Sequence, residues 1–439
     1  MKIINMLIII LVKILSKTLN MLGKKAGTLP GRLALILNKN IKNYLKIDGK
    51  IIVITGTNGK TTTTNMIYEI LKREGKTVIC NKDGNNIEWG ITTVLLNNCG
   101  ITGRIKHDYI VIETDEHWVS KIYSDNNLKI DSFIVLNLFA DQLDRTGDVN
   151  VIISKLEKFI ETSFDGNLIL NGNDPNVVKL GLKNKKGKNF YFGVDKLNSK
   201  NNDKKLVCPI CNSNIKYEFN HYSHIGKFKC SNCNYGKIKF CKVVKKIDGN
   251  VFYVNEEKYI TNNSNLYNVY NLISIIILKD IYKLNKKSLD YVFKNYSSNS
   301  GRYQKFIINN NECILNLGKN PAGVNVLLND IKKDSEKKEL HIIINDMIND
   351  GKDVSWVWDI DFNEMDSFER IICSGTRAYD LAIAIKCSGY NKNKIVVEHD
   401  VDLAIENLLK TNNKKYIISN YSPLPRTKNV LTKLQKGRK

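Results

Sequence analysis

The stretch VITGTNGKTTTTN, from Val53 to Asn65, has the residue types of a phosphate-binding loop. Gly56 and Gly59 let the backbone turn so that its N–H groups converge on an anion. Lys60 can neutralise the outer phosphates of a nucleotide, and the hydroxyl of Thr61 suits Mg²⁺. A plain strand–turn–helix junction would explain the glycines but not the Lys-Thr pair that follows them. We therefore predict a nucleotide site at Gly56, Thr57, Asn58, Gly59, Lys60, Thr61 and Thr62.

Two Cys-x-x-Cys pairs, Cys208/Cys211 and Cys230/Cys233, are separated by 18 residues, which is the spacing of a zinc ribbon. Two thiolates from each pair suit tetrahedral Zn²⁺, and a filled four-cysteine shell has no open position for catalysis. We therefore predict structural Zn²⁺ that holds a small, core-poor insertion together. A pair of disulfides, or unrelated buried thiols, is the alternative. His221 and His224 lie between the pairs and offer two further ligands.

An acidic block, NDMINDGKDVSWVWDID, runs from Asn345 to Asp361 directly after an expected strand. In the simplest interpretation these carboxylates are solvated or bind a cation, and Trp356 and Trp358 alternate as on a strand. A carboxylate at a strand end can also orient a histidine, as the third member of a nucleophilic triad does. The chain offers no nucleophile and base of its own for such a triad. We therefore expect this carboxylate to serve an active site contributed by another subunit.

The elements that position these residues alternate between strands and helices. Lys50–Thr55 is a short β-branched run before the glycine turn, and Thr61–Arg73 has apolar residues at helical spacing. Such alternation predicts a parallel α/β sheet covered on both faces. Further strands are expected at 77–79, 109–112 and 133–136, and the segments 168–175 and 189–194 continue the pattern.

The pattern changes at about Asn198, where a polar, lysine-rich segment begins, and a helical stretch resumes at Val269–Tyr282. From Gly301 a second α/β unit is expected, with strands at 341–344, 370–373, 394–397 and 416–418. We thus predict an N-terminal helical segment (1–48) and an ATP-binding domain (49–300) with a zinc-ribbon insertion (206–241). A C-terminal α/β domain (301–439) follows.

The composition is that of a soluble globular protein, with 42% hydrophobic and 25% charged residues in 439, but the net charge is +23. The charge is spread along the chain, and we expect no nucleic-acid partner. Ten cysteines in this length indicate a reducing compartment, so a cytoplasmic protein is expected. The apolar run Ile3–Val12 is too short to span a bilayer and is followed by Lys13. It predicts an amphipathic helix that packs on the protein or lies on the inner membrane face.

The phosphate loop is shorter than the usual Gly-x-x-x-x-Gly-Lys form, and GTNGKTT resembles the loop of the Mur ligase superfamily. VIETDE, LNGNDP, NVYN and Gly301-Arg302 also match, in order and spacing. The resemblance implies that ATP converts a carboxylate into an acyl phosphate, which an amine then attacks. It further implies an Mg²⁺ contact from Glu113, adenine contacts from Asn268 and Asn271, and a phosphate contact from Arg302.

From about residue 25 to 425 the chain resembles one family, the MurT subunits of lipid II isoglutaminyl synthase. The motifs are the phosphate loop, NLFADQLDRTGD, the cysteine insertion, KNPAGVN, NDGKDVSWVWD and SGTRAYDLA. The resemblance implies amidation of the α-carboxylate of D-glutamate in the lipid II stem peptide, giving D-isoglutamine. It implies a heterodimer with a GatD-type glutaminase that supplies ammonia, whose Cys–His pair is completed by Asp353. The chain departs from the family's usual Phe-Arg-Asp-Gln, Tyr-Gly-Glu and Gly-Arg-Met motifs at Ala140, Thr146 to Asp148 and Tyr303.

Two other functions are consistent with parts of the pattern. A stand-alone Mur-type or folylpolyglutamate-type ligase would add an amino acid and need no glutaminase. A zinc-ribbon ATPase that binds nucleic acid would show steeply salt-dependent binding. The ribbon has little interleaving of aromatic and basic residues, which ranks this function last.

Overall fold

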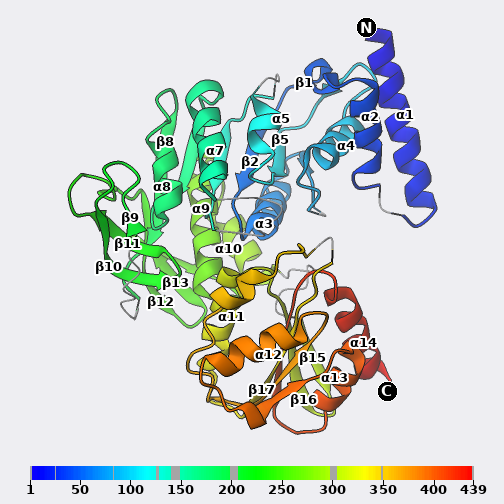
Figure 1. Cartoon of the computed structure of the whole chain (residues 1–439). Coiled ribbons are helices and arrows are strands. Elements are labelled where there is room, and N and C mark those ends of the chain that lie inside the picture. Colours follow the sequence, from blue (N-terminus) through cyan, green and yellow to red (C-terminus); the bar gives the residue numbers. More distant parts are fainter. Residues whose placement is uncertain are drawn as a thin grey trace. The chain divides into compact units, whose positions relative to one another are not determined.

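The computed structural model describes residues 2–24, 26–82, 84–124, 128–139, 149–197, 206–296, 304–347 and 350–437 (Figure 1). The chain divides into two compact units. Unit 1 comprises Met1–Phe139 and Asp148–Tyr296, and unit 2 comprises Ala140–Gly147 and Ser297–Lys439. Each unit has its own sheet and is described separately.

Unit 1 is built on a large sheet. Among the described residues it has nine strands in the order β14-β13-β12-β8-β7-β6-β2-β5-β3, parallel from β12 to β3 and closed by two antiparallel hairpins at the β14 edge. The strands are β2 (Lys50–Thr55), β3 (Val78–Cys80), β5 (Tyr109–Glu113), β6 (Ser132–Val135), β7 (Asn167–Asn171), β8 (Lys188–Val194), β12 (Lys242–Asp248), β13 (Val251–Val254) and β14 (Glu257–Ile260).

Helices cover both faces of this sheet, because its central strands are apolar on both sides. Ile51 and Val53 of β2 pack into one core with residues of α4, α5, α7 and α8. Ile52 and Ile54 point to the opposite face, where α3, α9 and α10 pack. The helices are α3 (Lys60–Arg73), α4 (Glu88–Asn98), α5 (Val119–Tyr123), α7 (Val149–Ser163), α8 (Pro175–Gly181), α9 (Leu266–Tyr282) and α10 (Lys286–Asn295).

The N-terminal elements lie against α4. Helix α1 (Lys2–Met21) packs on α2 (Leu29–Leu37) and α4 through Ile8, Ile9 and Val12, which are buried. After the short helix η1 (Ile41–Tyr44), β1 (Lys46–Ile47) pairs with β4 (Arg104–Ile105). The predicted N-terminal amphipathic helix is therefore present and packs on the protein.

The cysteine insertion leaves the sheet at β8 and returns at β12, which is the parallel neighbour of β8. Between them β9 (Leu206–Val207), β10 (Asn214–Tyr222) and β11 (Ile225–Cys230) form a small antiparallel sheet. Its own core is small, with Ile215, Phe228 and Tyr235 around two of the cysteines.

Unit 2 is a second α/β layer structure. Its described strands form a sheet in the order β15-β16-β20-β17-β18-β19, parallel except for the β15–β16 hairpin. One core includes α11, η2 and α12, and α13 and α14 pack on the opposite face. The elements are β15 (Gln304–Ile308), β16 (Asn311–Leu317), α11 (Pro321–Lys332), β17 (Lys338–Ile343), η2 (Ser355–Asp359), β18 (Phe368–Ser374), α12 (Ala378–Cys387), η3 (Lys392–Lys394), β19 (Ile395–Val397), α13 (Val401–Leu408), β20 (Lys414–Ser419) and α14 (Leu424–Lys436).

The predicted fold class, a parallel-sheet α/β domain with a cysteine insertion and a second α/β unit, is confirmed. The strand-like interpretation of Trp356 and Trp358 does not hold, because these residues lie in the 3-10 helix η2. Trp356 packs into the core of unit 2 while Trp358 is exposed. Residues two apart share one face of a strand but point in different directions in a tight helix, so one buried and one exposed tryptophan fits η2 and not a strand.

Candidate functional site

The predicted phosphate loop is a tight turn between β2 and α3. Its two glycines adopt positive φ angles, 132° at Gly56 and 91° at Gly59, a conformation that L side chains rarely adopt. A Cβ on Gly59 would lie 2.3 Å from Oδ1 of Asn271, so the side chain of Asn271 packs directly against the turn. Asn137 anchors the other side, since its backbone oxygen accepts from the N–H of Thr57 and its Oδ1 from that of Asn58, both at 2.9 Å.

Lys60 begins α3 and is 8% exposed. Its ammonium donates to the backbone oxygen of Gly56 and lies 3.1 Å from Oε2 of Glu116. Glu116 was not among the predicted site residues, although it follows Glu113 by three positions in VIETDE. One signal in the sequence could have identified Glu116: acidic residues continue beyond the end of a strand that lies beside the predicted lysine site. The contacts with Gly56 and Glu116 hold the ammonium of Lys60 next to the glycine turn.

Two oxygen atoms of the kind that bind Mg²⁺, one from Glu113 and one from Thr61, lie near Gly84 beside the loop. A Cβ built on Gly84 would lie 3.7 Å from Oε1 of Glu113 and 4.0 Å from Oγ1 of Thr61. β2 and β5 are neighbours, with Ile54 paired to Glu113, so the carboxyl end of β5 lies next to the loop. Asn86 donates to Oε1 of Glu113 at 3.1 Å. A carboxylate and a hydroxyl are the kinds of protein ligand that Mg²⁺ takes beside phosphates.

Of the other residues predicted to bind the nucleotide, some lie at the loop and others make different contacts. Thr57 and Thr62 are buried within the loop and the first turn of α3. Asn271 contacts the glycine turn, as described, whereas Nδ2 of Asn268 donates to the backbone oxygen of Asn263 at 2.7 Å. Arg302, and the residues Asp141, Asp144 and Arg145 of the NLFADQLDRTGD motif, lie outside the described residues.

The segment that supports the phosphate loop is itself supported by the cysteine insertion. Oγ1 of Thr57 accepts from the backbone N–H of Phe139 at 2.9 Å, and Oδ2 of Asp174 accepts from the N–H of Leu138 at 2.9 Å. His224, in the β10–β11 turn, lies 3.1 Å from Oδ1 of the same aspartate. The ring of His224 also packs on that of Phe139, with centroids 4.6 Å apart.

A second set of contacts fixes the same hairpin to unit 1. Asn173 Nδ2 donates to the backbone oxygen of Gly226 at 3.1 Å, and the N–H of Gly226 donates to the oxygen of Asn173 at 2.9 Å. His221 contacts the hydroxyl of Tyr270, on α9, at 2.7 Å. Burial lowers the pKa of His221 to about 4, so its ring is neutral at pH 7. His221 and His224 are thus used to dock the insertion onto unit 1.

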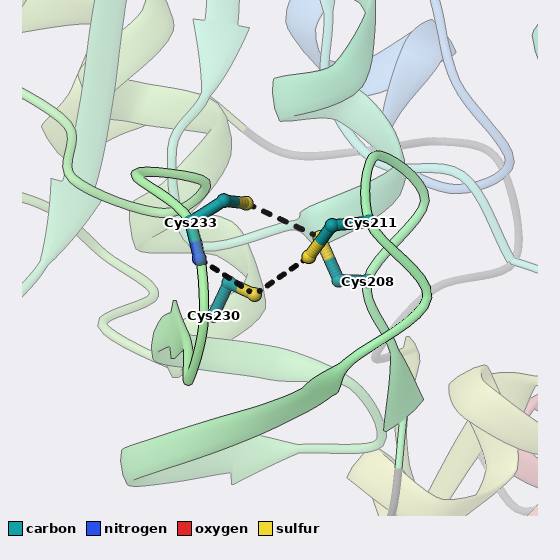
Figure 2. Close-up of side chains that lie close together, drawn as sticks. All are labelled: Cys208, Cys211, Cys230 and Cys233. Carbon is teal, nitrogen blue, oxygen red and sulfur yellow. Dashed lines mark hydrogen bonds between the residues drawn. The ribbon is translucent and has the colours of Figure 1, made fainter.

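The four predicted cysteines converge from two loops (Figure 2). Their Sγ atoms all lie within 4.8 Å of one another, with Cys211 and Cys230 at 3.4 Å and Cys208 and Cys233 at 3.7 Å. A tetrahedron with Zn–S bonds of about 2.3 Å has S–S edges of about 3.8 Å, so the cluster fits Zn²⁺. These separations are far longer than a disulfide of about 2.05 Å, and all four cysteines are free thiols in the structure.

Backbone N–H groups also point at the cluster. Those of Asn232 and Cys233 donate to Sγ of Cys230 at 3.3 and 3.4 Å, an arrangement that favours a thiolate. Hydrogen bonds from Ser213 lower the pKa of Cys211 to about 6. The donor set, four sulfurs with N–H support, therefore suits a closed structural zinc site.

Loss of the metal ligands should weaken nucleotide binding, because the hairpin that supports Phe139 belongs to the ribbon. We expect a Cys230→Ser/Cys233→Ser variant to lose zinc, measured by elemental analysis, and to bind ATP about tenfold more weakly in calorimetry. That factor corresponds to about 1.4 kcal/mol, roughly one lost hydrogen bond at the His224–Asp174 contact. Cys241→Ser, at an exposed cysteine outside the cluster, is the control. Zinc loss with unchanged ATP affinity would contradict the coupling.

Asp353 lies in unit 2, between β17 and η2. Its Oδ1 accepts from the backbone N–H of Ser355 at 2.9 Å, and hydrogen bonds from Ser355 lower the pKa of the carboxyl below its ordinary value. Val354 and Trp356, which follow Asp353 in the chain, are buried in the core of unit 2. The carboxylate is therefore ionised at neutral pH and is held by a rigid neighbouring segment.

The same segment is tied to the end of β20. Asp350 is 2% exposed, and its Oδ1 accepts from the backbone N–H of Ser422 at 2.9 Å. Asn345 is bonded to the same region, because its Nδ2 donates to Oγ of Ser422 at 3.1 Å and Nδ2 of Asn420 donates to its backbone oxygen at 2.7 Å. These contacts place the loop with Asp353 at the carboxyl edge of the sheet in unit 2.

Two family models match the chain: the Mur ligase middle domain over residues 54–236 and the MurT ligase C-terminal domain over residues 317–424. Curated relatives match almost its whole length. The protein "Lipid II isoglutaminyl synthase (glutamine-hydrolyzing) subunit MurT" of Staphylococcus aureus (strain COL) is 29% identical over 426 residues, 94% of each chain. The protein of the same name from Streptococcus pneumoniae is 29% identical, over 96% of this chain and 95% of the relative.

Solved structures share the fold. A pseudomurein peptide ligase type C from Methanothermus fervidus has a TM-score of 0.69 at 20% identity, covering 92% of this chain and 84% of its own. MurF from Acinetobacter baumannii has a TM-score of 0.65 at 15% identity, covering 92% and 80%. MurF ligase from Thermotoga maritima in complex with ADP has a TM-score of 0.62 at 13% identity, covering 93% and 85%. At these identities the likeness concerns the fold alone.

Proposed function

Because this chain belongs to the MurT family of Mur ligase-type, ATP-dependent enzymes, we propose that it is the synthetase subunit of a glutamine-hydrolysing amidotransferase. Its substrate is the α-carboxylate of D-glutamate in the stem peptide of lipid II, and its product is D-isoglutamine. Its partner in a heterodimer is a GatD-type glutaminase. The observation that carries the proposal is similarity to MurT relatives over 94% of the chain, including both the phosphate loop and the Asp353 segment.

The reaction proceeds in two steps. An oxygen of the carboxylate attacks the γ-phosphorus of ATP, and ADP leaves with the electrons of the broken P–O bond. The lone pair of ammonia then attacks the carbonyl carbon, phosphate leaves with the C–O electrons, and the nitrogen loses a proton. Phosphorylation is needed because a carboxylate oxygen is otherwise a poor leaving group. Shielding the acyl phosphate from water prevents its hydrolysis.

The residues of unit 1 bind and orient the nucleotide. The positive end of α3 faces its phosphates, and Lys60 neutralises charge on the transferring phosphoryl group. Thr61 and Glu113 would hold Mg²⁺, which would supply further positive charge at the phosphates. Glu116 keeps the lysine side chain directed at the turn, at 3.1 Å.

Asp353 serves the partner. An ionised carboxylate beside the glutaminase histidine holds that ring in the orientation and tautomer needed to activate the cysteine. Ammonia released there reaches the acyl phosphate before it becomes protonated in bulk water, which gives proximity as well as the reactive form. The enzyme works in the cytoplasm, at the inner face of the membrane where its lipid-anchored substrate lies.

Reconstitution tests the proposal. The purified chain, ATP, Mg²⁺, glutamine and lipid II are combined with and without the glutaminase, and the product is analysed by mass spectrometry. We expect amidated lipid II only when both proteins are present. Addition of an amino acid by the chain alone would instead identify a stand-alone ligase.

A further inference from the structure

Helix α1 presents two different apolar faces. Ile8, Ile9 and Val12 are buried against unit 1, whereas a separate stripe at steps of three and four residues faces outward. The stripe, called the α1 outer face, consists of Ile3, Ile4, Leu7, Ile10, Leu11 and Ile14, each 36 to 73% exposed. Figure 1 shows α1 as the outermost helix of unit 1, beside α2 and α4. So many exposed large aliphatic residues on one helix mark an interaction surface.

The charged residues of the N-terminal segment are all positive. The first 47 residues contain nine Lys and Arg residues and no Asp or Glu, the first acid being Asp48. Lys2 and Lys17 on α1, Arg32 on α2 and Lys39 beyond it are exposed. An apolar stripe bordered by cations, with no anion in the segment, is complementary to a surface that is apolar inside and negative outside.

The inner side of α1 distinguishes a helix that lies on a bilayer from one that crosses it. α1 is long and apolar enough to span, with a mean hydropathy of 1.8. Its inner polar groups, however, are bonded to the protein: Asn5 Oδ1 accepts from Asn38 at 2.8 Å, Ser16 Oγ from Asn97 at 3.0 Å, and Lys13 Nζ donates to the backbone oxygen of Asn97 at 2.9 Å. Spanning would break these bonds, whereas lying flat keeps them.

We propose that the α1 outer face docks unit 1 onto an anionic phospholipid bilayer, with the helix in the plane of the interface. This rests on the proposed function in one respect, since a membrane-bound substrate gives the docking its purpose. The docking itself follows from the exposed stripe and the charges. It brings the enzyme to its substrate by restricting the search to the membrane surface.

Vesicle co-sedimentation of the full chain tests the docking. We expect binding to phosphatidylcholine vesicles that contain about a third phosphatidylglycerol, weaker binding to pure phosphatidylcholine, and release by high salt. Leu7→Glu/Ile14→Glu should lower the binding constant at least about tenfold, whereas Val151→Glu, at an exposed apolar residue of α7, should leave it unchanged. Equal binding of the two vesicle types, or no effect of the double variant, would overturn the proposal.

Two further measurements separate the alternatives. Alkaline carbonate should extract the bound chain from vesicles, and retention would instead indicate a spanning helix. Ultracentrifugation should give the same association state for the wild type and the double variant, since a dimer lost in the variant would assign the face to a second copy of the chain.

Amidation of a water-soluble, short-chain lipid II analogue should be unchanged by the double variant. Absence of that activity in the wild type would refute the proposed function but not the docking.

Discussion

Replacing Lys60 by alanine should lower ATP-dependent amidation by at least about a thousandfold, to the background of a product assay. The ammonium is the positively charged side chain of the loop GTNGKTT, whose other residues offer backbone N–H groups, hydroxyls and the amide of Asn58. Without it, negative charge that spreads over the γ-phosphoryl oxygens in the transition state is less well neutralised. ATP affinity, measured by calorimetry, should fall as well.

The variant also removes the cation beside Glu116, whose side chain is 5% exposed, so loss of activity has to be separated from loss of structure. In Lys60→Ala/Glu116→Gln, a neutral amide replaces the buried carboxylate and needs no cation beside it. We expect this double variant to lose amidation to the same extent as Lys60→Ala but to unfold at a higher temperature. Lys72→Ala, at an exposed lysine of the same helix, should be fully active. Glutamine hydrolysis by the two-subunit complex should persist in all three variants. Surviving amidation in Lys60→Ala would refute the phosphate assignment.

The features predicted from the sequence are those with a local cause. A β-branched run followed by glycine and a helical pattern specifies β2, the turn and α3 within one or two residues. Parallel strands place their carboxyl ends at one edge of the sheet, so Glu113, at the end of β5, falls beside the loop that follows β2. The cysteine spacing likewise identifies the cluster without any knowledge of the surrounding fold.

The features that were missed depend on contacts distant in sequence. The turn of the ribbon hairpin supports the phosphate loop through His224, Asp174 and Phe139, and no spacing predicts which strand end an inserted hairpin will meet. His224 was considered only as a metal ligand, because a histidine between two cysteine pairs has that association. Trp356 and Trp358 resemble strand residues in the sequence because a two-residue spacing over so short a segment does not separate a strand from a tight helix.

Asp353→Asn should abolish glutamine hydrolysis in the two-subunit complex, by about 10³- to 10⁴-fold in kcat, while leaving ATP binding intact. The amide keeps an oxygen for the N–H of Ser355, so the turn survives, but it carries no charge to orient the partner's imidazole. The lowered pKa of Asp353 means that the carboxylate remains ionised as the pH falls from 8 to 5, so its own protonation should not limit the wild-type rate there.

Ammonium chloride distinguishes this role from a structural one. At raised pH, where more of the added ammonium is free ammonia, the Asp353→Asn complex should amidate lipid II with ATP at close to the wild-type rate, because the synthetase site is untouched. Asp361→Asn is the matched control, since Oδ1 of Asp361 accepts from the N–H of Asn363 at 3.1 Å in the same kind of turn, and it should retain hydrolysis. Normal glutaminase turnover in Asp353→Asn would exclude the aspartate from the partner's site. Loss of amidation that ammonia does not restore would show that the residue instead acts within this chain.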